Sequence, residues 1–160
     1  MKKGFRCFSS AIAAVLLIAA VQTAGARARS VSPEDRLSIS QPRYSGTWKG
    51  NDLSVVYSYS TNQGQMTLSG RVEFSYSMVM GYVILEDFRL SAVLLDENGI
   101  VLEEIGLATE HDGFDPIPFN RQISLPPKAA YIAFGYQGIA VDAGKSGQGR
   151  TSFWHDPVRN

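Results

Sequence analysis

Both histidines of the chain are followed directly by an aspartate, and each pair lies in a short polar segment. Two imidazoles and two carboxylates brought together could hold a divalent cation such as zinc. The alternative interpretation is that the aspartates and the neighbouring glycine only shape turns. The turn interpretation is the simpler one, so we expect no metal and no cofactor. The residues of the two segments are nevertheless the candidates for ligand binding: His111, Asp112, Asp115, Trp154, His155 and Asp156.

The other motifs of catalytic chemistry are missing around these histidines. The nucleophile motif Gly-x-Ser-x-Gly does not occur in the sequence. Neighbouring carboxylates such as Glu86 and Asp87 would point to opposite faces of a strand. A pair arranged in that way cannot act as acid and base on one substrate. We therefore predict that the protein is not an enzyme.

The two tryptophans, Trp48 and Trp154, offer flat apolar rings on which sugars can stack. If two or more aromatic rings lie exposed on one face, the protein is a candidate carbohydrate-binding module. If the rings are buried, they belong to the core and the hypothesis loses its basis. A carbohydrate-binding module is therefore the alternative to a module that binds a protein partner.

The first 26 residues predict an exported protein. Lys2, Lys3 and Arg6 precede an apolar run over residues 11–21, and Ala24-Gly25-Ala26 supplies a signal-peptidase site. The apolar run is too short for a membrane helix, which needs about 20 residues. We expect cleavage after Ala26, a periplasmic or secreted product and no membrane span.

Removal of the signal peptide changes the composition in two ways. The signal holds three of the 15 basic residues and no acid, so 12 bases face 15 acids and the net charge becomes −3. A protein of that charge is a poor candidate for nucleic-acid binding. The single cysteine, Cys7, is removed as well, which excludes disulfides and thiolate chemistry. The expected partner is an unidentified protein outside the cytoplasm.

The remaining chain divides into a predicted tether and one domain. Residues 27–46 are rich in serine, proline and charge, which predicts a flexible tether, with a short helix at Pro33 after Ser32 as the alternative. Residues 47–157 alternate between apolar and polar side chains, as half-buried strands do. Turn sequences recur every 8–12 residues, and Asn98-Gly99 is the strongest hairpin signal. We predict an all-β, antiparallel, immunoglobulin-like sandwich of about seven strands, with a small barrel as the alternative.

The strand segments also predict how the sheets are covered. A hairpin is expected over residues 53–74, and long strands over residues 82–96 and 100–108. The end of the first long strand, Ala92–Leu95, is continuously apolar, which indicates cover on both faces. Shorter strands are expected near residues 119–125, 130–136 and 152–154.

Part of this domain resembles exported bacterial FxLYD-type domains, whose pattern is a strand ending in Phe-x-Leu-Tyr-Asp before a glycine hairpin. Leu94 and Asp96 match the pattern, while Ala92 and Leu95 replace its aromatic residues. The resemblance spans about 35 of the 134 residues that follow the signal and implies a small exported sandwich without a known activity. It rests on three segments: residues 68–72, 92–96 and 98–102.

Two further segments bear on binding. Residues 86–115 hold nine acids and one base, Arg89, which could orient a basic partner or simply protect a sheet edge. Residues 76–82 form an unusually apolar connection. We expect it to lie beneath the sandwich, whereas an exposed position would indicate a ligand or partner site.

Overall fold

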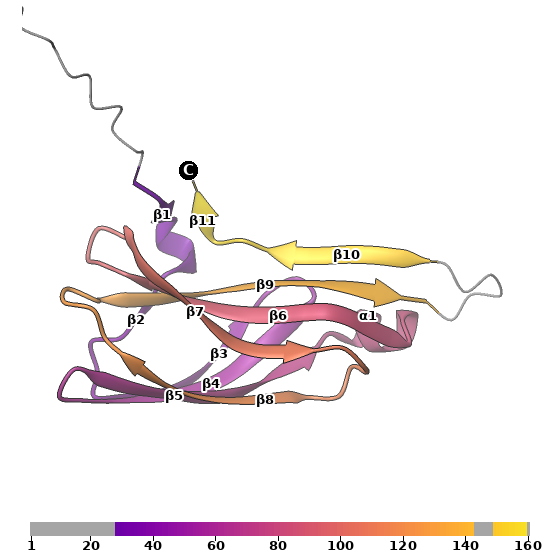
Figure 1. The fold of residues 1–160 in the computed structure, drawn as a ribbon, viewed down its shortest axis with the longest axis horizontal. Helices are drawn as coiled ribbons and strands as arrows, with labels where there is room; N and C mark the ends of the chain where they lie inside the picture. The colour runs from indigo at the N-terminus through magenta and orange to yellow at the C-terminus, as the bar shows by residue number, and fades with distance from the viewer. Residues whose placement is uncertain (1–27, 143–148, 160) are drawn as a thin grey trace, which may run out of the picture.

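Alternating buried and exposed side chains build two antiparallel sheets that pack face to face (Figure 1). The computed structural model describes residues 28–142 and 149–159, so the predicted signal peptide lies outside the described residues. The described elements are β1 (Ser30–Val31), η1 (Pro33–Asp35), β2 (Leu37–Ser38), β3 (Arg43–Lys49), β4 (Leu53–Asn62), β5 (Gln65–Phe74), α1 (Tyr76–Gly81), β6 (Ile84–Leu95), β7 (Val101–Glu110), β8 (Ile117–Ser124), β9 (Tyr131–Val141), β10 (Arg150–His155) and β11 (Val158–Arg159).

The connections between the sheets follow the Greek-key pattern of a sandwich. One sheet has the order β3-β4-β5-β8, and the other has the order β10-β9-β6-β7, with β2 also paired to β9. Consecutive strands β5 and β6 belong to different sheets. The consecutive strands β8 and β9 also belong to different sheets, with β8 paired to β5 and β9 paired to β6. Strands β5, β6, β8, β9 and β10 thus take the places of strands B, C, E, F and G of the immunoglobulin fold. The predicted all-β sandwich is confirmed, with short additional strands at both ends.

The core lies between the two sheets. On β4, Val55, Tyr57 and Tyr59 are buried and alternate with side chains on the outer face. Aromatic rings from both sheets meet there: the Phe134 ring lies 5.2 Å from Tyr57 and 5.8 Å from Trp48, between centroids. Such pairs add to the stabilisation that burial of their area already gives.

Turn residues close the hairpins at the predicted places. Gln63 and Gly64 join β4 to β5 with φ of 49° and 76°. After β6, the Asp96 carboxylate accepts hydrogen bonds from the backbone N–H of Asn98 at 2.9 Å and of Ile100 at 2.8 Å. Gly99 completes this turn with φ of 82°, which a side chain would disfavour.

The predicted tether is wrong for the described part of residues 27–46. β1 pairs with β11, with Val31 opposite Val158, so the two ends of the domain form a small sheet of their own. Val31 is buried against Val93, Leu95 and Ala133 on the outer face of the large sheet. This second core is the reason that Ala92–Leu95 is continuously apolar. It also buries Val31, although the polar composition of residues 27–46 gave no sign of a buried residue. The alternative at Pro33 is confirmed as the 3-10 helix η1.

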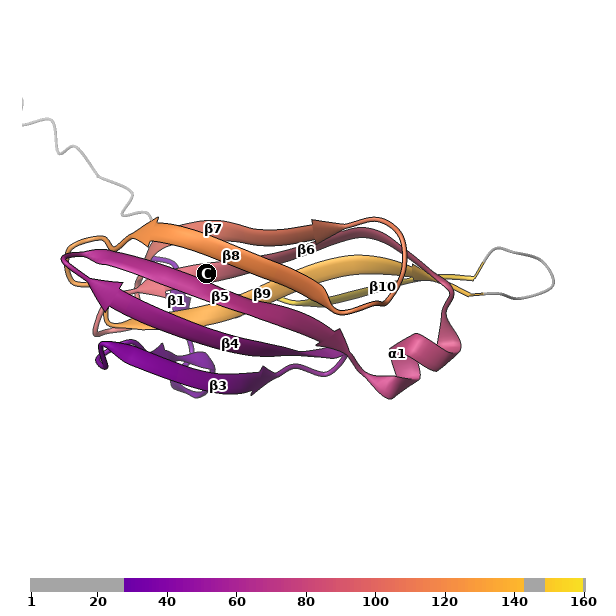
Figure 2. The same cartoon turned by 90° about the horizontal axis from the view of Figure 1, so that it is seen from below.

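The apolar connection after β5 forms α1, which lies at one end of the sandwich (Figure 2). The expectation that it would be buried is wrong, because Met78 is its one buried residue. The side chains of Tyr76 and Met80 are 79% and 67% exposed. A helix of six residues is too short to show the periodicity by which helices are found in a sequence.

Candidate functional site

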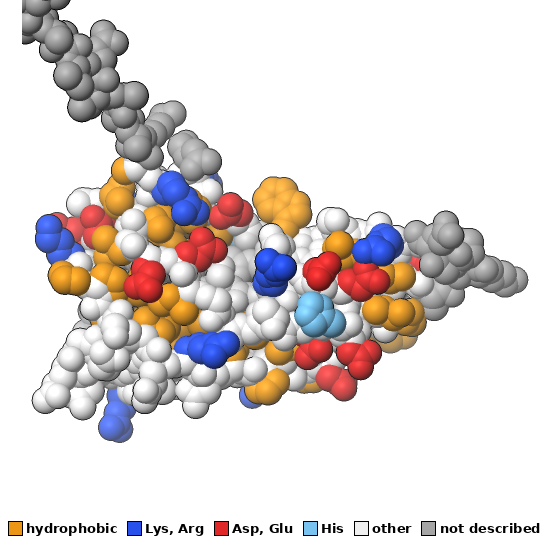
Figure 3. Space-filling view, viewed as in Figure 1, with side chains coloured by type: hydrophobic (Ala, Val, Ile, Leu, Met, Phe, Trp, Pro, Cys, Tyr) orange, Lys and Arg blue, Asp and Glu red, His pale blue; other side chains and the backbone are white. Residues whose placement is uncertain are grey.

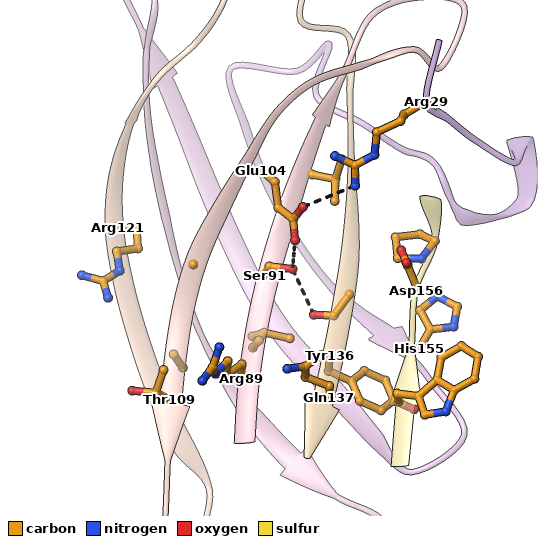
Figure 4. A pocket seen from close by; sticks show the side chains of 17 residues that line it. Arg29, Arg89, Ser91, Glu104, Thr109, Arg121, Tyr136, Gln137, His155 and Asp156 are labelled. Atoms are coloured by element: carbon orange, nitrogen blue, oxygen red, sulfur yellow. Dashed lines mark hydrogen bonds and ion pairs between the residues drawn. The ribbon is translucent and has the colours of Figure 1, made fainter. Parts of the chain in front are cut away.

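A trough of about 740 Å³ lies on the outer face of the β10-β9-β6-β7 sheet. One wall is a row of four side chains on four neighbouring strands: Trp154, Gln137, Arg89 and Thr109. The ladder sets Gln137 opposite both Trp154 and Arg89, and Arg89 opposite Thr109. Three strand spacings of about 4.8 Å give this row a length of about 14 Å. Figure 4 shows Thr109, Arg89 and Gln137 side by side.

The floor of the trough is a parallel row of small residues. Ser91 on β6 lies opposite Gly135 on β9 and Gly106 on β7. A β-bulge between Leu90 and Ser91 shifts the register of β7 and sets Gly106, rather than buried Leu107, beside Ser91. Two glycines and a serine beside a row of long side chains produce the depression. A side chain at Gly106 would meet no atom within 4 Å of its Cβ, so the space above it is open.

The opposite wall comes from β7 and from the residues that precede β1 and β11. Arg29 lies 3.7 Å from a carboxylate oxygen of Glu104, and the Ser91 hydroxyl donates to the other oxygen at 3.2 Å (Figure 4). The Asp156 carboxylate accepts a hydrogen bond from the Val158 N–H at 2.9 Å. Both carboxylates of the trough therefore have partners within the protein.

Two arginines of the trough lack such partners. Neither Arg89 nor Arg121 makes a hydrogen bond or ion pair with another residue in the part of the chain that the structure describes. Three arginines line the trough against two carboxylates, so this surface is locally cationic although the expected exported chain is acidic, and the Arg121 guanidinium lies at its outer margin (Figure 4). A ligand that offers negative charge would complete the guanidinium hydrogen bonds.

The two tryptophans have opposite environments. Trp154 is 68% exposed at the end of the row, whereas Trp48 is 9% exposed and packs in the core. A stacking platform made of both tryptophans is therefore not formed. Of the rings that line the trough, those of Tyr136 and His155 are partly or fully buried, and Trp154 is the largely exposed one.

His155 lines the trough and also packs against aromatic rings at the edge of the core. Its ring is 5.3 Å from Trp48 and stacks on Tyr136 at 6.0 Å, between centroids. Its Nε2 atom is 3.7 Å from Asp35 Oδ1, which is too long for a hydrogen bond. The imidazole is thus held between aromatic rings, and its buried Nε2 atom makes no hydrogen bond with the described residues.

The other predicted site residues lie at the far edge of the same sheet. His111 follows β7, and its Nδ1 atom is 3.9 Å from Asp87 Oδ1. Asp112 and Asp115 are exposed on the next loop. Strands β9 and β6 separate β10 from β7, a distance of about 14 Å at the usual spacing. The two histidine–aspartate pairs do not meet, and one ion cannot bind both imidazoles. Across residues 28–142 and 149–159, no group of three or more His, Cys, Asp and Glu residues is placed to hold a metal ion.

Two buried tyrosines have strongly shifted pKa values. Burial raises the pKa of Tyr136 to about 12, and the adjacent Asp52 carboxylate, which accepts its hydroxyl hydrogen bond at 2.8 Å, adds to the effect. Burial likewise raises the pKa of Tyr57 to about 12, with a further contribution from Tyr44 and Tyr59. Both hydroxyls stay protonated at neutral pH, and the Tyr136 hydroxyl acts as a hydrogen-bond donor to Asp52.

The end of the molecule near α1 carries a second distinctive surface. Residues 75–85 contain no charged side chain, and five large apolar residues of this stretch are exposed: Tyr76, Val79, Met80, Val83 and Ile84. We call these five residues the end patch. The Leu85 N–H donates to the Asp112 carbonyl at 2.7 Å, so the acidic loop borders the end patch. In Figure 3, acidic side chains lie next to apolar ones toward this end.

Comparisons with known proteins give no relative. No family model matches the chain, and neither curated proteins nor solved structures provide a match. The resemblance to FxLYD-type domains stays a prediction. Among the described residues, no helix has the length and apolar character that crossing a membrane requires.

Sequence reasoning identified Trp154 but missed the rest of the row. Arg89, Gln137 and Thr109 each occupy an outward position, and Arg89 does so between the buried residues Phe88 and Leu90. This alternation was visible in the sequence. The alignment of the three strands was not, because it depends on pairings between β6, β7, β9 and β10 and on the bulge.

Proposed function

We propose that this chain is an exported, non-enzymatic binding module whose ligand occupies the trough. The observation that carries the proposal is the row of an aromatic ring, an amide, a guanidinium and a hydroxyl above a floor of glycine and serine. Ligand sites are concave and combine apolar surface with a few convergent polar groups. The trough has this composition, and the signal sequence supports a periplasmic or secreted location.

The state of the polar groups supports binding rather than catalysis. Glu104 is neutralised by Arg29 and Ser91, and Asp156 holds the turn before β11. A general base must reach the proton that it removes and must be free to accept it. The carboxylates of the trough are engaged with partners of their own, so the side chains left to a ligand are those of the row.

A glycine substitution tests the trough directly. Gly106→Phe would place a ring in the open space above the floor without a clash at Cβ. Gly113→Phe is the matched control, because Gly113 also has open space around its Cβ and does not line the trough. On glycan and peptide arrays, wild type and Gly113→Phe should bind the same ligand, and Gly106→Phe should lose it. If every ligand that the wild type binds on the arrays is also bound by Gly106→Phe, or if the wild type binds none, the proposed function is contradicted.

A second candidate function is docking of a partner protein at the end patch. Large apolar side chains grouped on a surface and rimmed by charge are characteristic of protein interfaces. The rim is acidic, with Asp87 and Asp112 exposed, so the partner would present apolar side chains flanked by lysine or arginine.

Photo-crosslinking in the cells that produce the protein tests this second candidate. A crosslinking residue at Met80, in the end patch, should form an adduct with one protein, and replacement of Asp87 and Asp112 by asparagine should weaken it. The same residue at exposed Asn98, in the turn after β6, is the control. Equal adducts from both positions, or none from Met80, would exclude docking at the end patch.

A further inference from the structure

We propose that the ligand of the trough is an acidic oligosaccharide, a chain of sugar rings that bear carboxylates. This inference rests on the proposed function and specifies its ligand. It depends on three properties of the trough: unpaired cationic side chains, one exposed aromatic ring, and an orientation across the strands.

The charge of the trough favours a carboxylate ligand. The guanidinium of Arg89 stands in the middle of the row, between Gln137 and Thr109, and Arg121 lines the trough from β8. Neither has a partner among the described residues. A guanidinium offers two parallel N–H donors that match the two oxygens of a carboxylate. Glu104, which would repel such a ligand, is already bound to Arg29.

The remaining side chains of the trough suit the neutral parts of a sugar. The Trp154 ring is largely exposed at one end of the row and can cover the C–H face of a sugar ring. The Gln137 amide and the Thr109 hydroxyl both donate and accept hydrogen bonds, as sugar hydroxyls do. The row thus places one stacking surface beside three polar side chains over about 14 Å, a length that suits a short oligosaccharide.

The direction of the trough argues against an extended peptide as the ligand. The row runs across four strands and the floor across three of them, so the backbone N–H and C=O groups of the central strands β9 and β6 are paired with their neighbours on both sides. A bound peptide could not add a strand there, and its own backbone groups would depend on a few side chains for hydrogen bonds. A sugar chain has no such backbone requirement and is recognised by side chains alone.

Calorimetry with defined probes tests the ligand class. The probes are a short oligogalacturonate, the oligogalactose of the same length, and an oligoglutamate peptide of matching charge. Wild type should bind the oligogalacturonate at least about tenfold more tightly than either of the other two, with an affinity that falls as salt rises. Binding should also change the fluorescence of exposed Trp154.

Variants of single arginines assign the effect to the trough. Arg89→Gln should weaken oligogalacturonate binding by about tenfold or more, and Arg89→Lys should restore only part of it, because lysine lacks the planar fork. Arg43→Gln is the matched control, since Arg43 is an exposed arginine on β3 of the other sheet.

The outcomes separate the inference from the proposed function. Equal or tighter binding of oligogalactose, sensitive to Gly106→Phe but not to Arg89→Gln, would overturn the acidic ligand and leave the trough as a binding site. Tighter binding of oligoglutamate would assign the trough to an acidic peptide and also overturn the inference. Oligogalacturonate binding that survives Gly106→Phe would place the ligand elsewhere and overturn it as well.

Discussion

The Tyr136 hydroxyl links the two sheets of the sandwich. Tyr136 lies on β9, and its hydroxyl donates to a carboxylate oxygen of Asp52, in the turn between β3 and β4, at 2.8 Å. The same ring stacks on His155, which lines the trough. One side chain therefore stabilises the contact between the sheets and the packing under Trp154. Loss of the Tyr136 hydroxyl should therefore change the free energy of unfolding and its dependence on alkaline pH.

Tyr136→Phe should lower the free energy of unfolding at neutral pH by about 1–2 kcal/mol, because the Asp52 carboxylate loses a partly buried donor. In the wild type, the pKa of Tyr136 is raised by burial to about 12 in the folded state, above its ordinary value of 10.0. The folded state then holds this proton more tightly, so its contribution is complete below pH 10 and is lost as the pH rises to about 12.

The measurement is urea unfolding at several pH values between 8 and about 12. Tyr136→Phe should show a shallower loss of stability over the alkaline range than wild type, with part of the loss remaining because Tyr57 titrates there as well. Tyr76→Phe, in an exposed ring, should behave as wild type. Parallel pH profiles for wild type and Tyr136→Phe would contradict the role of this hydroxyl.

At the scale of elements, the local sequence pattern predicts the strands, and packing between distant segments decides which of their faces are buried. Strands β4, β5 and β6 and their turns followed from alternation and turn chemistry, since both signals lie within a few residues. The apolar end of β6 even indicated that something covers its outer face. What covers it did not follow, because β1 and β11 have two residues each and gain their burial from each other and from Val93 and Leu95.

The candidate site shows the same division. Trp154 could be selected as a candidate binding residue from its type, but so could Trp48, which the structure places in the core. Residue type gives the chemistry that a side chain can perform, and the pairing of distant strands decides which side chains act together. The bulge that brings Gly106 beside Ser91 has no clear sequence signal, and the floor of the trough depends on it.

At the scale of the whole molecule, the pairing of the two chain ends couples stability to the trough. Arg29 precedes β1, while Asp156 and Pro157 precede β11, and these residues form the wall opposite the row. The small β1–β11 sheet stays in place through the burial of Val31 against the large sheet. Detachment of this sheet would remove one wall and expose Val93 and Leu95, while the main core between the two large sheets would stay buried.

Val31→Asp should therefore affect both properties. A carboxylate in this cluster would lose hydration that the surrounding apolar side chains cannot replace, so the free energy of unfolding should fall by about 3 kcal/mol. The backbone amides of β1 and β11 should exchange with solvent faster than those of β6 and β9. Arg159→Ala is the control, because it removes an exposed ion pair with Glu34 that contributes about 1 kcal/mol or less. If β1 and β11 hold the wall, Val31→Asp should also weaken ligand binding under conditions where the main core remains folded. Unchanged amide exchange in β1 and β11 would show that the wall does not depend on Val31.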